Sequence, residues 1–189
     1  MSKRSNSGHV ITTVVNAVTK DIEKECFGSP EKEIALDELT DEFQIALAKK
    51  NLTLEILKQN WRDSLYNAVS VAILRLSAPF NVTYSIQLLR YKTSEYMIGH
   101  RSKFQKNFKN NDVFNEYCKC LASSQMQGSS IPEAFALANA LQVKIRIYYA
   151  LKIAADGFIY EERGELYSQF IEIAYITETK EFLPVFRNT

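Results

Sequence analysis

The hydrophobic pattern changes its period once along this chain, where residues 131–142 give way to residues 143–149. The first segment opens with Pro132 and Glu133 and repeats apolar residues every three or four positions, which predicts a short helix. In the second segment apolar residues alternate with polar ones, which predicts a strand with one buried face. A helix that runs directly into a half-buried strand restricts the chain to folds in which helices pack on a sheet.

The segments on either side of this switch complete the expected architecture. Apolar residues at helical spacing predict an amphipathic helix that ends near residue 50 and a second helix over about 53–77, interrupted at 60–64 by two good N-caps. Two further helices are expected to begin near Asn81 and Asp112. Apolar runs at 170–176 and 182–186 predict two more strands, and Pro184 predicts that the second lies at an edge or ends there. This order predicts an α+β fold with helices packed on a small sheet.

We expect three regions. Residues 1–28 are expected to form a flexible N-terminal tail, residues 29–54 a helical arm, and residues 55–189 the main domain. The arm is amphipathic, so it either packs on the main domain or presents an apolar stripe to a partner.

Composition excludes several classes of partner. The 189 residues carry 23 Lys and Arg against 22 Asp and Glu, a net charge of +1, so no bulk attraction to nucleic acid or to an anionic membrane follows. The basic residues within 101–109 are spaced like a solvated face. No apolar run is long enough to span a bilayer, which takes roughly 20 residues. We expect an intracellular protein, cytoplasmic or nuclear, without a nucleic-acid or membrane partner.

The sequence contains few motifs that indicate a particular catalytic or ligand-binding chemistry. The chain has no glycine-rich nucleotide loop and no nucleophile elbow. The two histidines, His9 and His100, lie in the tail and in an exposed-looking turn. The three cysteines, Cys26, Cys118 and Cys120, show no metal-ligand spacing with them. We therefore expect no metal and no cofactor.

Three blocks of the sequence nevertheless resemble the ovarian-tumour (OTU) domain cysteine deubiquitinases. The family's Asp-Gly-x-Cys-Leu-Phe-Arg-Ala is similar to residues 61–68, Trp-Arg-Asp-Ser-Leu-Tyr-Asn-Ala. A family helix that ends in Leu-Arg, followed by a Tyr-Met and Phe-rich stretch, is similar to residues 89–117. The most specific block is residues 127–148, which resembles the family's Gly-Gly, helix and strand. The resemblance implies a papain-like OTU-type fold, with residues 55–189 as an OTU-like domain that carries an N-terminal helical extension.

The departures from the family pattern bear on activity. The resemblance puts Ser64 at the position of the nucleophilic cysteine, Glu181 at that of the base, and Leu183 where the family often orients the imidazole. Trp61 and Arg62 stand for the Asp and Gly of the loop that helps to hold the oxyanion. A low-pKa thiol can be ionised by a nearby histidine, whereas a serine hydroxyl depends on a general base. The resemblance therefore implies a degenerate member that lacks the catalytic pair.

Two functions follow from this interpretation. The first is an inactive pseudo-deubiquitinase that serves as a protein–protein interaction module, regulating a complex or binding ubiquitin, with ubiquitin, a second copy of the chain or another protein as partner. Its candidate binding residues are large side chains of the types that dominate interfaces: Trp61, Arg62, Phe158 and Tyr160, the last two in an expected solvated loop.

The alternative is an active OTU-type ubiquitin isopeptidase in which Ser64 is natural or engineered. Engineering would explain Ser64 alone and not Glu181, Leu183, Trp61 and Arg62. A serine hydrolase in which Glu181 or His100 assists Ser64 is a further variant of this alternative.

Overall fold

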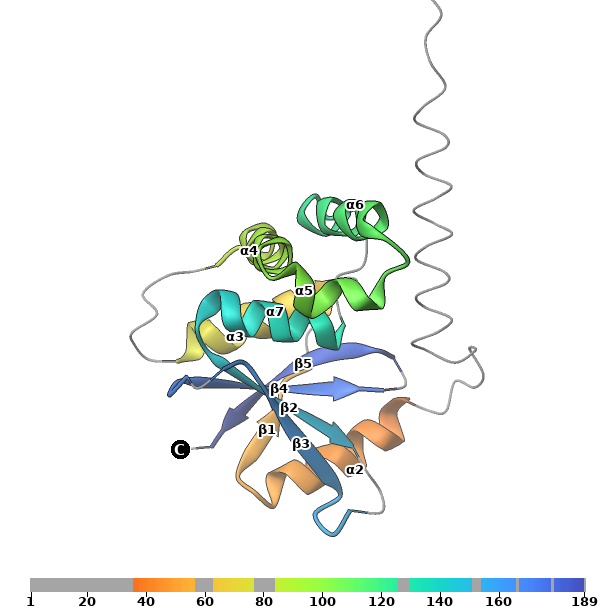
Figure 1. The fold of residues 1–189 in the computed structure, drawn as a ribbon. Helices are drawn as coiled ribbons and strands as arrows, with labels where there is room; N and C mark the ends of the chain where they lie inside the picture. Colours follow the sequence, from red (N-terminus) through yellow and green to blue (C-terminus); the bar gives the residue numbers. More distant parts are fainter. Residues whose placement is uncertain are drawn as a thin grey trace, which may run out of the picture.

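The computed structural model describes residues 36–56, 63–76, 84–125, 130–150, 154–165, 167–177 and 179–188. A mixed sheet divides the molecule (Figure 1): α3 to α7 cover one face and α2 lies against the other. The strand order is β1-β5-β4-β2-β3. The strands are β1 (Leu52–Leu54), β2 (Lys144–Ala150), β3 (Phe158–Arg163), β4 (Phe170–Ile176) and β5 (Glu181–Arg187). β2 and β4 are parallel, and the other neighbouring pairs are antiparallel.

The switch from helix to strand is built as the sequence predicts. α7 (Ile131–Leu141) has Pro132 in its first turn and ends at Gln142, whose backbone is left-handed with φ 57°. This conformation lets the N–H of Val143 donate to the carbonyl of Ala138, so the chain leaves the helix and enters β2 at once. In β2 the alternate residues Ile145 and Ile147 are fully buried under the helices.

The other helices contribute buried side chains to the two hydrophobic clusters. They are α2 (Leu36–Ala48), α3 (Ser64–Arg75), α4 (Ile86–Gly99), α5 (Arg101–Phe104) and α6 (Asn111–Ala122). Ser85 and Asn110 cap α4 and α6, because their side chains accept hydrogen bonds from the N–H groups of Leu88 and Val113. None of the helices in the described ranges is long and apolar enough to cross a membrane.

Two hydrophobic clusters lie on the two faces of the sheet. The larger one joins the sheet to the helical layer through residues such as Leu65, Leu89 and Phe182. The smaller one contains Phe43 and Leu47 of α2. The amphipathic face of residues 29–54, whose role the sequence leaves open, is therefore packed on the sheet over the described part of that segment.

Two strands replace segments for which the sequence predicts other structure. Residues 52–54 form β1 and not the start of a helix, because Leu52 and Leu54 bury their side chains while Thr53 stays exposed, the alternation of a strand. Residues 158–163 form β3 and not a solvated loop. β3 pairs with β2 along its whole length, so its backbone hydrogen-bond partners come from a strand that the sequence of β3 does not reveal.

Pro184 lies inside the sheet, not at an edge or a strand end, because β5 has β1 on one side and β4 on the other. Its carbonyl accepts a hydrogen bond from the N–H of Glu55, so its nitrogen, which carries no hydrogen, also faces the β1 side. β1 ends at Leu54, one residue before Glu55. The proline is tolerated because the partner strand stops where a ladder hydrogen bond would be lacking.

Candidate functional site

Ser64 is the first residue of α3 and lies against the start of β5. Its side chain is fully buried, and its Oγ accepts a hydrogen bond of 3.1 Å from the backbone N–H of Phe182. This bond keeps the Cα atoms of Ser64 and Glu181 within roughly 9 Å of each other, from the bond lengths that connect them. The structure therefore brings together Ser64 and Glu181, two residues 117 positions apart in the sequence, as the resemblance to the OTU family predicts.

Glu181 and Leu183 stand in different surroundings. Glu181 is the half-buried first residue of β5, opposite Ile176 of β4. Leu183 is buried in the smaller hydrophobic cluster, on the α2 side of the sheet, whereas Phe182 packs into the larger cluster. Leu183 thus serves as a core residue of β5.

An ion pair between the buried Arg90 and the half-buried Asp63 fixes the residue before Ser64. The carboxylate of Asp63 does not cap α3 but accepts a hydrogen bond of 2.7 Å from Nε of Arg90. Arg90 is 1% exposed, and it also donates to the carbonyl of Leu121 at 3.2 Å. Its guanidinium lies 5.1 Å from the ring centre of Tyr66. One arginine thereby joins α3, α4 and α6 behind the site.

Glu133 is a second buried acid in this layer. It is 1% exposed, and Tyr117 of α6 donates a hydrogen bond to its carboxylate. Burial raises the pKa of Glu133 to about 7, and the nearby Arg90 only partly opposes this rise. Sequence reasoning matched Arg90 and Glu133 to family blocks but gave them no role. Their burial depends on helices that only the fold brings together.

The binding candidates separate into different environments. Phe158 was expected on a solvated loop but belongs to the core: it is 8% exposed, and its ring contacts those of Phe43 and Tyr148. Tyr160 is 56% exposed and stands over the guanidinium of Arg146, 4.8 Å from its ring centre. Phe170 lies 4.7 Å from the same guanidinium. Trp61 and Arg62 lie outside the described residues.

We call Tyr160, Arg146 and Phe170 the Tyr160 patch. Arg146 is held there by Glu162 at 2.7 Å and by Glu172 at 3.3 Å. The patch is a set of aromatic rings stacked on one fixed guanidinium, a composition that suits a protein contact.

His100 and Cys118, two further side chains that could take part in catalysis, are held by a neighbouring residue or buried. The ring of His100 stacks on Tyr96 and hydrogen-bonds its carbonyl at 3.0 Å. Burial raises the pKa of the Cys118 thiol to about 12, so it is not a reactive thiol. Within the ranges that the structure describes, no group of three or more His, Cys, Asp or Glu side chains could hold a metal ion.

The fold is shared with solved OTU domains. The OTU domain of OTUD1 superposes with a TM-score of 0.61 at 16% identity, covering 78% of this chain and 93% of that one. An OTU domain in complex with ubiquitin gives a TM-score of 0.53 at 16% identity, covering 72% and 70% of the two chains.

An OTU deubiquitinase from Wolbachia pipientis wMel, bound to ubiquitin, gives a TM-score of 0.54 at 12% identity and covers 73% of this chain and 97% of that one. No curated protein sequence matches the chain. The family model for OTU-like cysteine proteases matches residues 63–179, which include Ser64 and both strands of the central parallel pair. The chain belongs to the OTU-like cysteine protease family.

Proposed function

We propose that this chain is a catalytically inactive OTU-like domain that serves as a protein–protein interaction module. The observation that carries the proposal is the state of Ser64: its hydroxyl is buried and already accepts the N–H of Phe182. A nucleophile has to reach a substrate carbonyl and to pass its proton to a base. A hydroxyl enclosed in this way ties α3 to β5 and is not presented to a substrate.

The chemistry of the neighbouring position supports the same conclusion. OTU-type cleavage depends on a thiol that a histidine can ionise, and the chain has serine at 64 and glutamate at 181. A carboxylate is a weaker base than an imidazole and is poorly suited to take a proton from a hydroxyl. Leu183, buried in an apolar cluster, adds no polar group that could orient a base.

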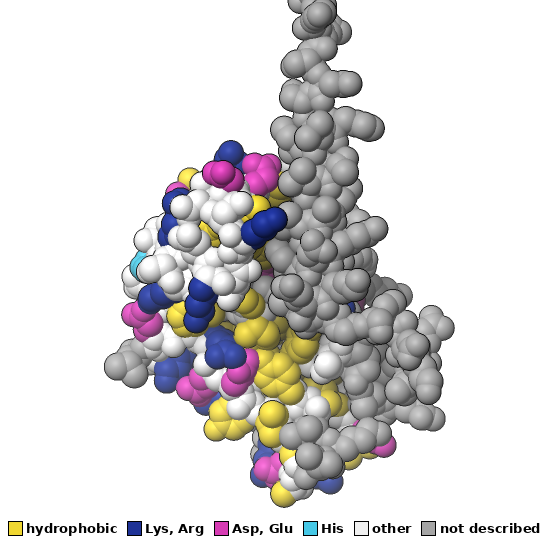
Figure 2. Space-filling view, turned by 45° about the vertical axis from the view of Figure 1, so that its right-hand side comes forward, with side chains coloured by type: hydrophobic (Ala, Val, Ile, Leu, Met, Phe, Trp, Pro, Cys, Tyr) yellow, Lys and Arg dark blue, Asp and Glu magenta, His cyan; other side chains and the backbone are white. Residues whose placement is uncertain are grey.

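Ubiquitin is the partner that we propose to test first. Two of the OTU structures that share this fold carry ubiquitin, which supports a ubiquitin-type surface on this chain. The Tyr160 patch offers exposed aromatic anchors, and Figure 2 shows further hydrophobic side chains gathered in a band below the helical layer. A second copy of the chain is the other candidate, since a surface with such anchors also suits self-association.

The inactive state is tested by incubating the whole chain with ubiquitin chains and with an electrophilic ubiquitin probe. We expect no cleavage and no covalent adduct. The double variant Ser64→Cys with Glu181→His should restore little activity, because Leu183 and the loop residues at 61 and 62 still differ from the family pattern. Turnover by the unaltered chain that disappears in Ser64→Ala, with the fold retained, would establish the active alternative instead.

Binding is tested by titrating labelled ubiquitin with the chain and with two matched variants. Tyr160→Ala removes an anchor of the Tyr160 patch, and Tyr91→Ala removes a similarly exposed tyrosine on α4. If the patch is the anchor, Tyr160→Ala should lose about 2 kcal/mol or more, roughly thirtyfold in Kd, while Tyr91→Ala binds normally. Equal binding by both variants would remove the Tyr160 patch from the interface.

A further inference from the structure

β1 forms one edge of the sheet, and among the residues that the structure describes part of its backbone has no partner strand. On its inner side, Asn51 accepts from the N–H of Asn188, and Glu55 donates to the carbonyl of Pro184. Thr53 lies opposite Phe186 between these two bonds. In an antiparallel ladder alternate residues face the partner, so the N–H and C=O groups of the two leucines of β1 point away from β5. Such an edge is a template for one more strand.

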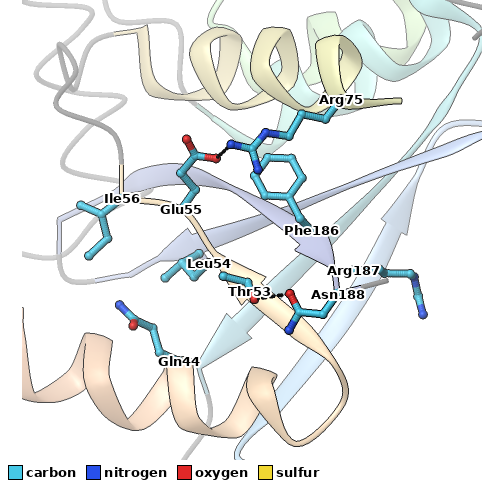
Figure 3. Close-up of a pocket in the computed structure, with 9 residues that line it drawn as sticks. All are labelled: Gln44, Thr53, Leu54, Glu55, Ile56, Arg75, Phe186, Arg187 and Asn188. Atoms are coloured by element: carbon cyan, nitrogen blue, oxygen red, sulfur yellow. Dashed lines mark hydrogen bonds and ion pairs between the residues drawn. The ribbon is translucent and has the colours of Figure 1, made fainter. Parts of the chain in front are cut away.

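A groove runs along this edge. It has a volume of about 720 Å³ and is open to solvent. Figure 3 shows β1 between the two helices that frame the groove, with Gln44 projecting from α2 and Arg75 reaching from α3 toward Glu55. Asn188, at the end of β5, lies beside Thr53, which donates a hydrogen bond of 2.7 Å to its side chain. The floor is therefore strand backbone, and the rims are polar side chains.

The lining of the groove favours a negatively charged occupant. The guanidinium of Arg75 lies 4.1 Å from the ring centre of Phe186, and this stacking fixes its plane. It forms an ion pair of 2.7 Å with Glu55, the one carboxylate among the lining residues that the structure describes, and its side chain remains 55% exposed. A guanidinium has five N–H donors, so Arg75 can bind a second carboxylate. Arg187 also lines the groove, but its guanidinium is already bound by the carboxylate of Glu172 at 2.9 Å, so the acidic preference rests on Arg75.

We propose that this groove binds an extended acidic peptide segment of a partner protein, which adds a strand to the free edge of β1 and places a carboxylate on Arg75. Main-chain hydrogen bonds to β1 give the segment its direction, and Arg75 selects an acidic side chain. The site goes beyond the proposed function. Arg75 is the last residue of α3 and Ser64 is the first. At 1.5 Å per residue, the two positions lie about 16 Å apart along the helix axis.

The probe is a synthetic nine-residue peptide of alternating valine and glutamate, labelled at its N-terminus and titrated by fluorescence anisotropy. Alternation places all its glutamates on one face of an added strand. Two control peptides separate the two contributions: one replaces every glutamate by glutamine, and the other carries N-methyl groups on alternate amides, which block strand pairing. The protein variants are Arg75→Gln and the control Lys119→Gln, a 74% exposed lysine on α6.

The unaltered chain and Lys119→Gln should bind the glutamate peptide equally. Arg75→Gln should weaken that binding about tenfold and should no longer distinguish glutamate from glutamine, as expected for a charge-assisted contact. N-methylation should weaken binding about tenfold or more.

Equal binding of the N-methylated peptide would refute strand addition, and equal binding of the glutamine peptide would refute the acidic preference. Failure of the glutamate peptide to bind at millimolar concentration would refute the proposal as a whole. Sedimentation that shows a dimer broken by Arg75→Gln would assign the edge to a second copy, which also overturns it. None of these results depends on ubiquitin binding or on catalysis, so the proposed function stands or falls separately.

Discussion

Replacing Ser64 by alanine tests whether its hydroxyl is a structural group. The change removes the acceptor of the hydrogen bond from Phe182, and that N–H lies in the buried interior of the molecule. A buried donor that loses its acceptor costs about 1–3 kcal/mol. Alanine is the better helix former at this position and returns about 0.5 kcal/mol. We therefore expect Ser64→Ala to lower the free energy of unfolding by about 0.5–2.5 kcal/mol.

The assay is urea unfolding followed by far-UV circular dichroism, with thermal unfolding as a second measurement. For a chain of this size the expected loss corresponds to about 1–10 °C in Tm. Ser102→Ala is the matched control, because Ser102 is an exposed serine at the start of a helix. It should change stability by less than about 0.5 kcal/mol.

The result that would refute this reasoning is an unchanged stability of Ser64→Ala. It would mean that the bond between Ser64 and Phe182 contributes nothing to the fold, and the main support for the inactive reading would then be lost. A stability loss of the expected size together with retained secondary structure would instead show that Ser64 connects α3 to β5.

Three further predictions concern the buried groups. Since the folded-state pKa of Glu133 is raised to about 7, the folded state binds more protons than the unfolded state between about pH 4.5 and 7. Stability should therefore fall as pH rises through this window, by on the order of 3 kcal/mol, and pH-dependent urea unfolding of Glu133→Gln should show that this dependence is lost. Arg90→Ala removes the hydrogen bonds from Arg90 to the half-buried carboxylate of Asp63 and to the carbonyl of Leu121, and should cost about 2–3 kcal/mol at pH 7; a loss below about 1 kcal/mol in urea unfolding would contradict the structural role of this ion pair. Phe158→Ala should cost about 3–5 kcal/mol in thermal or urea unfolding, because Phe158 is a core residue, whereas Tyr160→Ala should change stability little; the reverse order would contradict the assigned burial.

The site was partly readable from the sequence. Ser64 could be matched because it stands in a block that resembles the OTU family, and the fold then brings it to Glu181, which the resemblance puts at the position of the base. The bond from the N–H of Phe182 could not be foreseen, since it depends on how closely α3 approaches β5. Phe158 and Tyr160 look equivalent in the sequence, and only the pairing of β3 with β2 assigns one to the core and the other to solvent.

The sequence by itself determined the elements whose own residues carry a clear hydrophobic pattern. The helix over 131–141 has its proline and its apolar spacing, and β2 and β4 have alternating or continuous apolar residues that can be buried in one way only. The tertiary structure decided the elements whose partners are distant. β1 is three residues long and pairs with β5 more than 130 positions later, and Pro184 is tolerated inside β5 only because β1 stops beside it. The hydrogen bonds and burial that stabilise such segments come from other parts of the chain, so their own residues do not reveal them.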